Sequence, residues 1–412
     1  MNIIKSFLLR IVCISFIIIF PFALFTVSAQ KLTNVQLDGK SLNTITTAVP
    51  FLMIAPDARS GALGDIGVAS SPDANSIHWN PAKLAFIKKQ LGFSVSYTPW
   101  LRALVNDINI SYLGGYKRID KKQVIGASLL YFSLGKIDFT DETGYQYMEY
   151  SPNEFATAVS YARRLSDQLS LGISLRFIYS NLTGGVFVGG SETKAGTAVS
   201  ADISSYYHKD IALGDKNTNL AFGINISNIG SKMTYTESAE KDFIPINLRL
   251  GTAWRMDLDK FNTLCVLIDV NKLLVPSPPK YDSTGINILA GKDPNRGIVS
   301  GMFGSFNDAP AGFTEEIHEF TYSLGLEYWY DKQFALRAGY FNEHATKGNR
   351  KYFAVGAGLK YNVFGVDFAY LIPTEQRHPL ENTLRFTLLF DFNAFKGKSS
   401  PLKDAEEKKA DK

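Results

Sequence analysis

Most of this 412-residue chain repeats one pattern, in which large apolar residues alternate with small, polar or charged ones. Successive strand residues point to opposite faces of a sheet, so this period of two predicts β-strands with one apolar and one polar face. Between Leu169 and Tyr179, for example, every second residue is a large aliphatic or aromatic one. The runs predict about fourteen strands, with approximate spans 91–99, 107–117, 123–133, 153–163, 168–180, 196–208, 218–228, 245–256, 262–272, 319–330, 334–342, 351–360, 363–371 and 382–393.

Charged residues fall on the polar side of many strands, among glycines and serines. They are Arg176, Asp202, Arg249, Arg255, Asp269, Glu327, Arg337, Arg385 and Asp391. A soluble sandwich also alternates, but its apolar faces pack against each other. A charged inner face instead favours a polar lumen with the aliphatic residues facing lipid. Residues near strand ends fit the aromatic belts of membrane interfaces: Tyr97, Tyr161, Tyr179, Trp254, Tyr330 and Tyr370. We therefore predict an all-β, transmembrane antiparallel β-barrel of about 14 strands over residues 91–393.

The connections between the predicted strands alternate in length. Those after even-numbered strands are short and charged, such as 118–122 and 331–333, whereas those after odd-numbered strands are generally longer. Short periplasmic turns and longer outer loops are typical of bacterial outer-membrane barrels. This pattern predicts an outer-membrane location, with both mature termini periplasmic and the long loops extracellular.

The two ends of the chain differ from the barrel. Residues 1–29 resemble a secretory signal peptide, with Lys5 and Arg10 before an apolar core and a small-residue cleavage site at its end. Cleavage would leave Cys265 as the only cysteine and allow no intramolecular disulfide. No other run reaches the roughly 20 apolar residues of a transmembrane helix. Residues 394–412 are a charge run, expected to form a solvated periplasmic tail.

The segment from Met53 to Phe86 does not alternate. Its glycines, small residues and turn-forming pairs predict a compact, irregular backbone with short helical turns. Asn80 is expected to cap such a turn, which Pro81 opens and Ala82 continues. A segment this apolar needs a surface to pack against.

Two motifs in this segment, APDARSGALGDIGVA and HWNPAKLAF, resemble the opening of the PorV/PorQ family of the Bacteroidetes type IX secretion system, a branch of the FadL-like outer-membrane barrels. The resemblance implies that residues 30–90 form an N-terminal segment that plugs the lumen, with Asn80, Pro81 and Ala82 as the plug motif. It also implies docking to a SprA/Sov-like translocon barrel, binding of cargo proteins through their C-terminal secretion signal domains, and delivery to a PorU-like sortase attachment complex. Outer-membrane lipid is a further expected partner, and nucleic acid is not.

Two predicted outer loops are candidates for contact with cargo or partners. The longest interruption is 273–318, where prolines stiffen the start and aromatic residues are expected to act as apolar anchors. An ordered lid or docking surface is the favoured interpretation, and a disordered loop is the alternative. The loop at 183–194 has an apolar tip between glycine pairs, and an ordinary flexible loop explains it equally well. The candidate residues are Pro276, Pro278, Pro279, Phe303, Phe306, Phe313, Val186, Phe187 and Val188.

Motifs for chemistry are missing from the sequence. The five histidines are scattered without metal-ligand spacing, and neither a nucleophile elbow nor a Walker phosphate loop occurs. We therefore predict no metal, no cofactor, no catalytic residue and no enzymatic activity. A FadL-like transporter of hydrophobic small molecules across the outer membrane is the alternative function. It would need an apolar path through the lumen, which the polar inner face disfavours.

Overall fold

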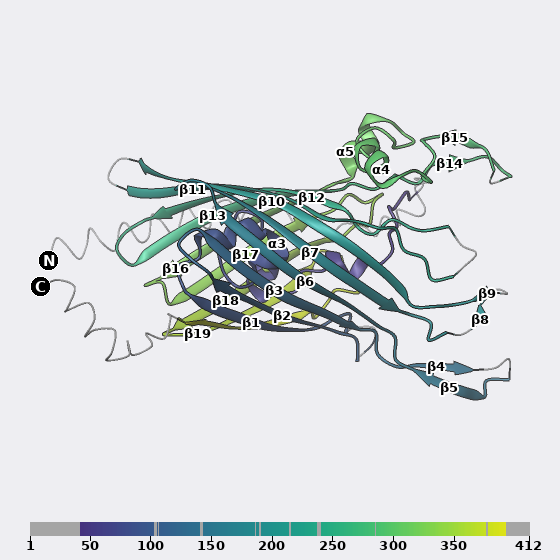
Figure 1. The fold of residues 1–412 in the computed structure, drawn as a ribbon, viewed down its shortest axis with the longest axis horizontal. Coiled ribbons are helices and arrows are strands. Elements are labelled where there is room, and N and C mark those ends of the chain that lie inside the picture. The colour runs from purple at the N-terminus through teal and green to yellow at the C-terminus, as the bar shows by residue number, and fades with distance from the viewer. Residues whose placement is uncertain are drawn as a thin grey trace, which may run out of the picture. The chain divides into compact units, whose positions relative to one another are not determined.

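The computed structural model describes residues 42–102, 105, 107–140, 143–185, 187–188, 191–213, 216–236, 240–284, 286–375 and 378–392. In this part of the chain, antiparallel strands close into a single barrel of fourteen strands, and the last strand pairs with the first (Figure 1). In their order around the barrel, the strands are β1 (Leu91–Pro99), β2 (Asn109–Arg118), β3 (Gln123–Ser133), β6 (Asn153–Arg164), β7 (Leu169–Asn181), β10 (Gly196–Leu213), β11 (Lys216–Gly230), β12 (Asn247–Asp257), β13 (Asn262–Leu273), β16 (Phe320–Tyr330), β17 (Phe334–Asn342), β18 (Lys351–Tyr361), β19 (Phe364–Pro373) and β20 (Leu384–Phe392).

The alternation sorts side chains between the two faces of the wall as predicted. Large aliphatic residues face outward, and Val159 and Leu175 each keep 66% of their surface exposed. Most of the charged residues predicted for the lumen face inward and are buried, including Asp202 and Arg385. Arg255 differs, because it lines a cavity near one barrel end and keeps 51% of its side chain accessible.

Short and long connections lie at opposite barrel ends, here called the short-turn end and the long-loop end. The segment 209–217, predicted as a turn, is mostly strand: β10 runs to Leu213 and β11 begins at Lys216, with Ile211 paired to Thr218. Backbone pairing continues here through Ile211, Ala212 and Leu213, so the hairpin turn is shorter than predicted. The long loops carry further elements: β4 (Ile137–Thr140), β5 (Gln146–Tyr150), β8 (Phe187–Val188), β9 (Ser191–Glu192), β14 (Lys280–Tyr281), β15 (Ile288–Ala290), α4 (Ile298–Gly304) and α5 (Phe313–His318).

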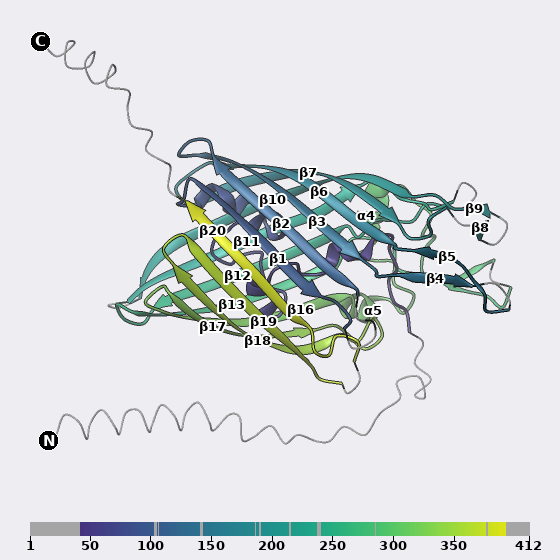
Figure 2. The same ribbon diagram turned by 90° about the horizontal axis from the view of Figure 1, so that it is seen from below.

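The segment before β1 fills the barrel and is called the plug below. It folds into η1 (Pro50–Met53), α2 (Ala58–Ala62), α3 (Ser76–Trp79) and η2 (Pro81–Phe86), seen inside the strands in Figure 2. Apolar residues pack against the wall in several places, of which two are described here. Phe51 and Leu52 contact wall residues near the long-loop end, while Ile77 and Leu84 pack against Tyr116 and its neighbours. Among the described residues, no helix is long and apolar enough to cross a membrane.

The plug passes through the lumen once, so its two ends lie at opposite barrel ends. Asn43 donates its backbone N–H to the Thr346 carbonyl in a long loop at 3.1 Å, whereas Gln90 bonds to Phe392 at the short-turn end. The short-turn end therefore holds Phe392, the last described strand residue, whereas Asn43 lies at the long-loop end. Both mature termini lie outside the described residues, so their predicted periplasmic location stays a prediction. Residues 1–29, the tail 394–412 and Val186 lie outside the described residues.

Candidate functional site

The Asn80-Pro81-Ala82 motif lies in the lumen, where Asn80 is the N-cap of η2. Asn80 Oδ1 accepts a hydrogen bond from the N–H of Ala82 at 3.1 Å. Its Nδ2 donates to the carbonyls of Val68 and Ser205, both at 3.0 Å. Pro81 suits the first helical position, because the N–H it lacks would have no intrahelical partner there. The buried Asn80 side chain thus caps η2 and hydrogen-bonds to both the plug backbone and strand β10.

The next residue of the motif is bonded directly to the wall. The Ala82 N–H also donates to Ser204 Oγ at 3.1 Å, and its carbonyl accepts from Ser170 Oγ at 2.7 Å. Opposite it, a Cβ placed on Gly172 would lie 2.5 Å from the Ala82 nitrogen. Glycine is therefore required on β7 for the plug backbone to approach this closely.

Arg59 of α2 is the centre of a buried ion network between plug and wall. Its Nε and Nη2 donate to both carboxylate oxygens of Glu327 on β16, at 2.9 and 2.8 Å, and its Nη1 reaches Asp73 at 2.8 Å. The same Glu327 carboxylate accepts from Arg337 on β17 at 2.8 Å, and Arg337 also pairs with Asp367 at 2.6 Å. All five groups are buried. The bidentate geometry is the strong form of the arginine–carboxylate pair.

A second link lies where the plug turns close to the wall. Asp65 accepts from Arg385 Nη1 and from the Tyr352 hydroxyl, each at 2.7 Å. The preceding residue, Gly64, has a φ of +79°, which favours glycine. The facing Gly339 makes room as well, since a Cβ there would lie 2.0 Å from the plug backbone. The small residues of this motif are thus explained by close contact with the barrel.

The Lys83 side chain is buried in the plug and bonds to other atoms of the plug. Its Nζ donates to the Gly67 carbonyl at 2.5 Å and to Ser70 Oγ at 3.0 Å, and burial lowers its pKa to about 8. Burial, together with Arg249 and other positive charge nearby, holds the pKa of His78 well below its usual value. His78 is therefore neutral at physiological pH.

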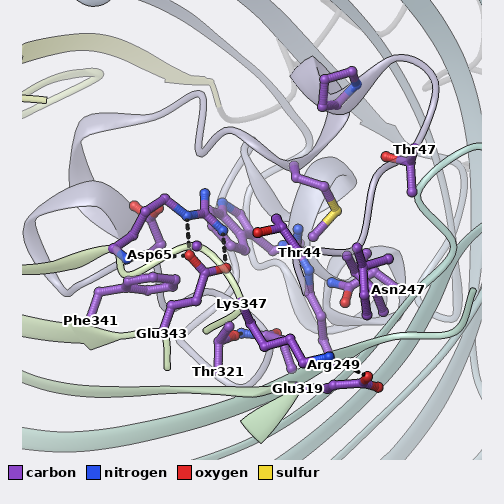
Figure 3. A pocket seen from close by; sticks show the side chains of 18 residues that line it. Thr44, Thr47, Asp65, Asn247, Arg249, Glu319, Thr321, Phe341, Glu343 and Lys347 are labelled. Carbon is purple, nitrogen blue, oxygen red and sulfur yellow. Dashed lines mark hydrogen bonds and ion pairs between the residues drawn. The ribbon is translucent and has the colours of Figure 1, made fainter. Parts of the chain in front are cut away.

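A cavity of about 270 Å³ lies at the long-loop end of the lumen, between the start of the plug and the barrel strands (Figure 3). Its charged lining residues are mostly paired. Arg350 makes a bidentate contact with Glu343 at 2.8 and 2.9 Å, and Lys347 contacts Glu319 at 3.0 Å. Arg249 lies over the Trp79 ring, 4.7 Å from its centroid.

The loop from 274 to 319 is held to the barrel by a buried ion cluster. Lys272 on β13 contacts Glu316 at 3.2 Å and Glu319 at 2.5 Å. Lys347, in the loop after β17, contacts Glu315 at 2.7 Å and also Glu319. All three glutamates lie in or directly after α5, so the helix is bonded to two separate points of the barrel rim.

Two of the three phenylalanines singled out in this loop point to solvent rather than into the protein. Phe303 and Phe313 keep 75% and 79% of their surface exposed, and Phe306 keeps 46%. Phe303 and Phe313 are therefore not the predicted apolar anchors, whereas the half-buried Phe306 has its ring centroid 5.7 Å from Lys272 Nζ. The ion cluster holds the loop together with Ile298 and Met302, which pack against the core. The prolines lie at its base, where Pro276 is buried and Pro278 and Pro279 are partly buried.

The second candidate loop is described in part. The backbone of Phe187 and Val188 forms β8, which pairs with β9 in a short hairpin. Thr193 then bridges to Thr236 in the loop after β11. The structure thus links the long loops that follow β7 and β11.

Sequence reasoning found the motif residues but missed the ion pairs that hold the site together. Arg59 and the α5 glutamates are separated from their partners by up to 268 residues, and no local pattern indicates such pairings. Within the described residues, no group of three or more His, Cys, Asp or Glu side chains could hold a metal ion, and Cys265 is buried as a free thiol.

An apolar outer wall, a charged lumen and fully closed antiparallel strands define a transmembrane β-barrel, the class found in bacterial outer membranes. A family model described as "Type IX secretion system protein PorV" matches residues 37–280, more than half of the chain. The chain belongs to this PorV family, as its motifs predicted, and is accordingly an outer-membrane component of type IX secretion. No curated protein sequence matches it.

Several solved structures are similar to the chain at low identity. The "TodX deltaS2S3 mutant monoaromatic hydrocarbon channel" is 12% identical, with 82% of this chain and 98% of that chain covered and a TM-score of 0.48. The Pseudomonas putida toluene transporter TodX is 11% identical, with 85% and 98% covered and a TM-score of 0.45. A Pseudomonas aeruginosa FadL homologue is 11% identical, with 86% and 100% covered and a TM-score of 0.40. The hydrocarbon and toluene ligands named here are those of the similar proteins.

Proposed function

We propose that this barrel docks beside a SprA/Sov-like translocon barrel and binds exported cargo through the cargo's C-terminal signal domain. It then carries the cargo to a PorU-like sortase attachment complex. The work is binding and transfer rather than catalysis, and no catalytic residue is assigned. The surface that binds is the long-loop end, chiefly the loop 274–319 and the hairpin loop 183–194.

One observation carries the proposal. A fully exposed phenylalanine loses the favourable free energy of burial, about 1.5–3 kcal/mol per side chain. The loop around α4 and α5 nevertheless exposes Phe303, Phe313 and Val299 while buried ion pairs hold its base. Exposed apolar groups on an ordered support are characteristic of a protein interaction surface. Without a partner, neither the buried ion pairs at the base of the loop nor the exposure of its phenylalanines would be explained.

The proposed topology places the long loops outside the cell and the short turns in the periplasm, with the tail 394–412 on the periplasmic side. In this arrangement the signal peptide 1–29 is removed, and the plug keeps the lumen closed while cargo is held outside. Closure matters because a barrel of this strand number has room for a pore. The buried bonds of Asn80 and Arg59 support such a plug.

The FadL-like transporter is supported less well. Cavities of about 270 and 350 Å³ lie at opposite ends of the lumen, and their linings include several charged residues. Between them lie the plug and the Arg59 network. An apolar small molecule crossing the lumen would have to displace these buried ion pairs.

Co-purification in mild detergent from the protein's own membranes tests the proposal. The tagged wild type is compared with Phe303→Ser/Phe313→Ser, and with Tyr361→Ser as a control, because Tyr361 is equally exposed near the short-turn end. We expect the wild type and the control to recover a large barrel and cargo sharing a C-terminal domain, and the loop variant to lose most of the cargo. Recovery of the barrel alone, carrying fatty acids or other apolar ligands, would favour the transporter.

A further inference from the structure

Positive charge is concentrated on one arc of the short-turn rim. Lys117 at the end of β2, Lys121 and Lys122 in the following turn, and Arg163 at the end of β6 are all exposed. None of these four, here called the basic arc, makes an ion pair within 4.0 Å to a described residue. The nearby acid, Asp120, interacts with the charge of Arg163 without forming an ion pair. It shapes the turn by accepting from the backbone N–H groups of Lys122 at 2.6 Å and Gln123 at 2.8 Å.

Two members of the basic arc stand on the outer wall of the barrel. Lys117 shares the outward face of β2 with Leu113, and Arg163 shares the outward face of β6 with Val159. Lys117 also pairs across the sheet with Ile125, an exposed apolar residue. These cations therefore lie at the edge of the lipid-facing surface, where long basic side chains reach the headgroup layer.

Tyr161, an aromatic neighbour of the basic arc, also indicates that the arc lies at the membrane–water interface. Ile125 pairs with Tyr161 on β6, and the Tyr161 hydroxyl donates to Gln123 Oε1 at 2.6 Å. Tyrosines with an apolar ring and a bonded hydroxyl are typical of the membrane–water interface. The place of the basic arc on the wall and its position next to Tyr161 thus both put the arc at the membrane–water interface.

The opposite arc of the same rim is built differently. The outward residues at the short-turn ends of β16 to β19 are all aromatic: Tyr330, Phe334, Tyr361 and Phe364. The turns there and after β12 are balanced, with Lys332 beside Asp331 and Lys260 beside Asp259. The arc from β2 to β6 therefore carries basic charge on its lipid-facing edge, whereas the same edge of β16 to β19 carries aromatic side chains.

We propose that the basic arc binds the phosphodiester headgroup of an anionic glycerophospholipid in the membrane leaflet on the short-turn side. Lys121 and Lys122 supply two compact positive charges from the turn. Arg163 supplies a planar guanidinium group that can bond to two phosphate oxygens at once. Basic residues near an anionic leaflet gain an affinity of roughly fivefold each. The site is distinct from the long-loop surface, which lies at the other barrel end.

Native mass spectrometry of the full-length protein in detergent tests this site. The protein is titrated with phosphatidylglycerol and with phosphatidylcholine of the same acyl chains. The variants are Lys121→Gln/Lys122→Gln, the same pair combined with Lys117→Gln and Arg163→Gln, and a control, Lys260→Gln/Lys332→Gln, which removes two lysines from the balanced turns. Heat-induced mobility shift on gels verifies that each variant is folded.

The wild type is expected to bind phosphatidylglycerol at least about a hundredfold more tightly than phosphatidylcholine. The turn pair should lose roughly 25-fold of this preference, the fourfold variant nearly all of it, and the control none. Equal binding of the two lipids, or an equal loss in the control, would overturn the proposal. Displacement of the lipid by an equal concentration of inorganic phosphate would overturn it too, by assigning the arc to a free anion. If the fourfold variant does not fold, the turn pair alone decides.

Discussion

At the scale of single residues, Arg59 contributes most to the connection between plug and barrel. It carries three charged contacts in a buried site, and removal of one partner from such a site leaves an uncompensated charge that costs about 3–5 kcal/mol. Arg59→Met should therefore lower the opening free energy of the plug by about 3 kcal/mol.

Hydrogen exchange of the amides in 58–69 measures this opening directly, and a loss of that size makes exchange about a hundredfold faster. The control is Lys136→Met, because the Lys136–Glu149 pair is exposed and worth at most about 1 kcal/mol. Equal protection of the plug in both variants would contradict the assigned role.

Lys83 gives the plug a pH dependence of defined sign. Its pKa is about 8 in the folded protein and 10.5 for the ordinary side chain, so between these values the unfolded state binds the additional proton. Stability should then rise with pH from about 8 to 10.5, by at most about 1.4 kcal/mol per pH unit. Below pH 8 both states are protonated and this contribution is constant.

Urea unfolding at several pH values between 8 and 10.5 tests this prediction. Lys83→Met should remove the rise relative to the wild type, whatever its effect on absolute stability. A parallel rise in wild type and variant would assign the pH dependence to other groups.

At the scale of elements, η2 depends on the cap that Asn80 supplies. Asn80→Ala removes the cap and two further hydrogen bonds, and leaves two carbonyls without those donors. A lost cap costs about 1 kcal/mol, and each unsatisfied buried group costs about 1–3 kcal/mol. We expect brief plug openings to become frequent enough to appear as ion conductance in planar bilayers. Asn153→Ala is the matched control, because that side chain makes an exposed hydrogen bond, and it should conduct no more than wild type.

The α5 loop should loosen when its ion cluster is broken. Lys272→Met leaves Glu316 and Glu319 buried without one of their cations, which is the costly case for buried pairs. Trypsin should then cut faster after Arg296, which precedes α4 and keeps only 17% of its side chain exposed while the loop is ordered. Lys136→Met, which breaks the exposed Lys136–Glu149 pair on another loop, should leave that rate unchanged. Unchanged cleavage in Lys272→Met would mean that packing, not charge, holds the loop.

At the scale of the whole molecule, the sequence predicted the barrel but not the ion pairs that hold the plug to its wall. Alternation can be recognised within a short stretch of sequence, so all fourteen strands were predicted. The ends of most of them lie within two or three residues of the observed ends. The prediction of a turn at 209–217 was wrong, because the charged residues Lys209 and Asp210 lie within a strand that continues to Leu213. Arg59 and Glu327, in contrast, become neighbours only after the barrel has closed, and the exposure of Phe303 depends on how the loop folds over the rim.

The central claim is that cargo is held at the long-loop end of a closed barrel. The most direct test is photo-crosslinking in living cells, with a photoreactive amino acid at Phe303, at Phe313 or, as control, at Tyr361. The account predicts that the two loop positions crosslink exported proteins sharing a C-terminal domain, or the translocon barrel, and that Tyr361 does not. Crosslinks to cargo from Tyr361, or none from either loop position while cargo is being exported, would contradict it.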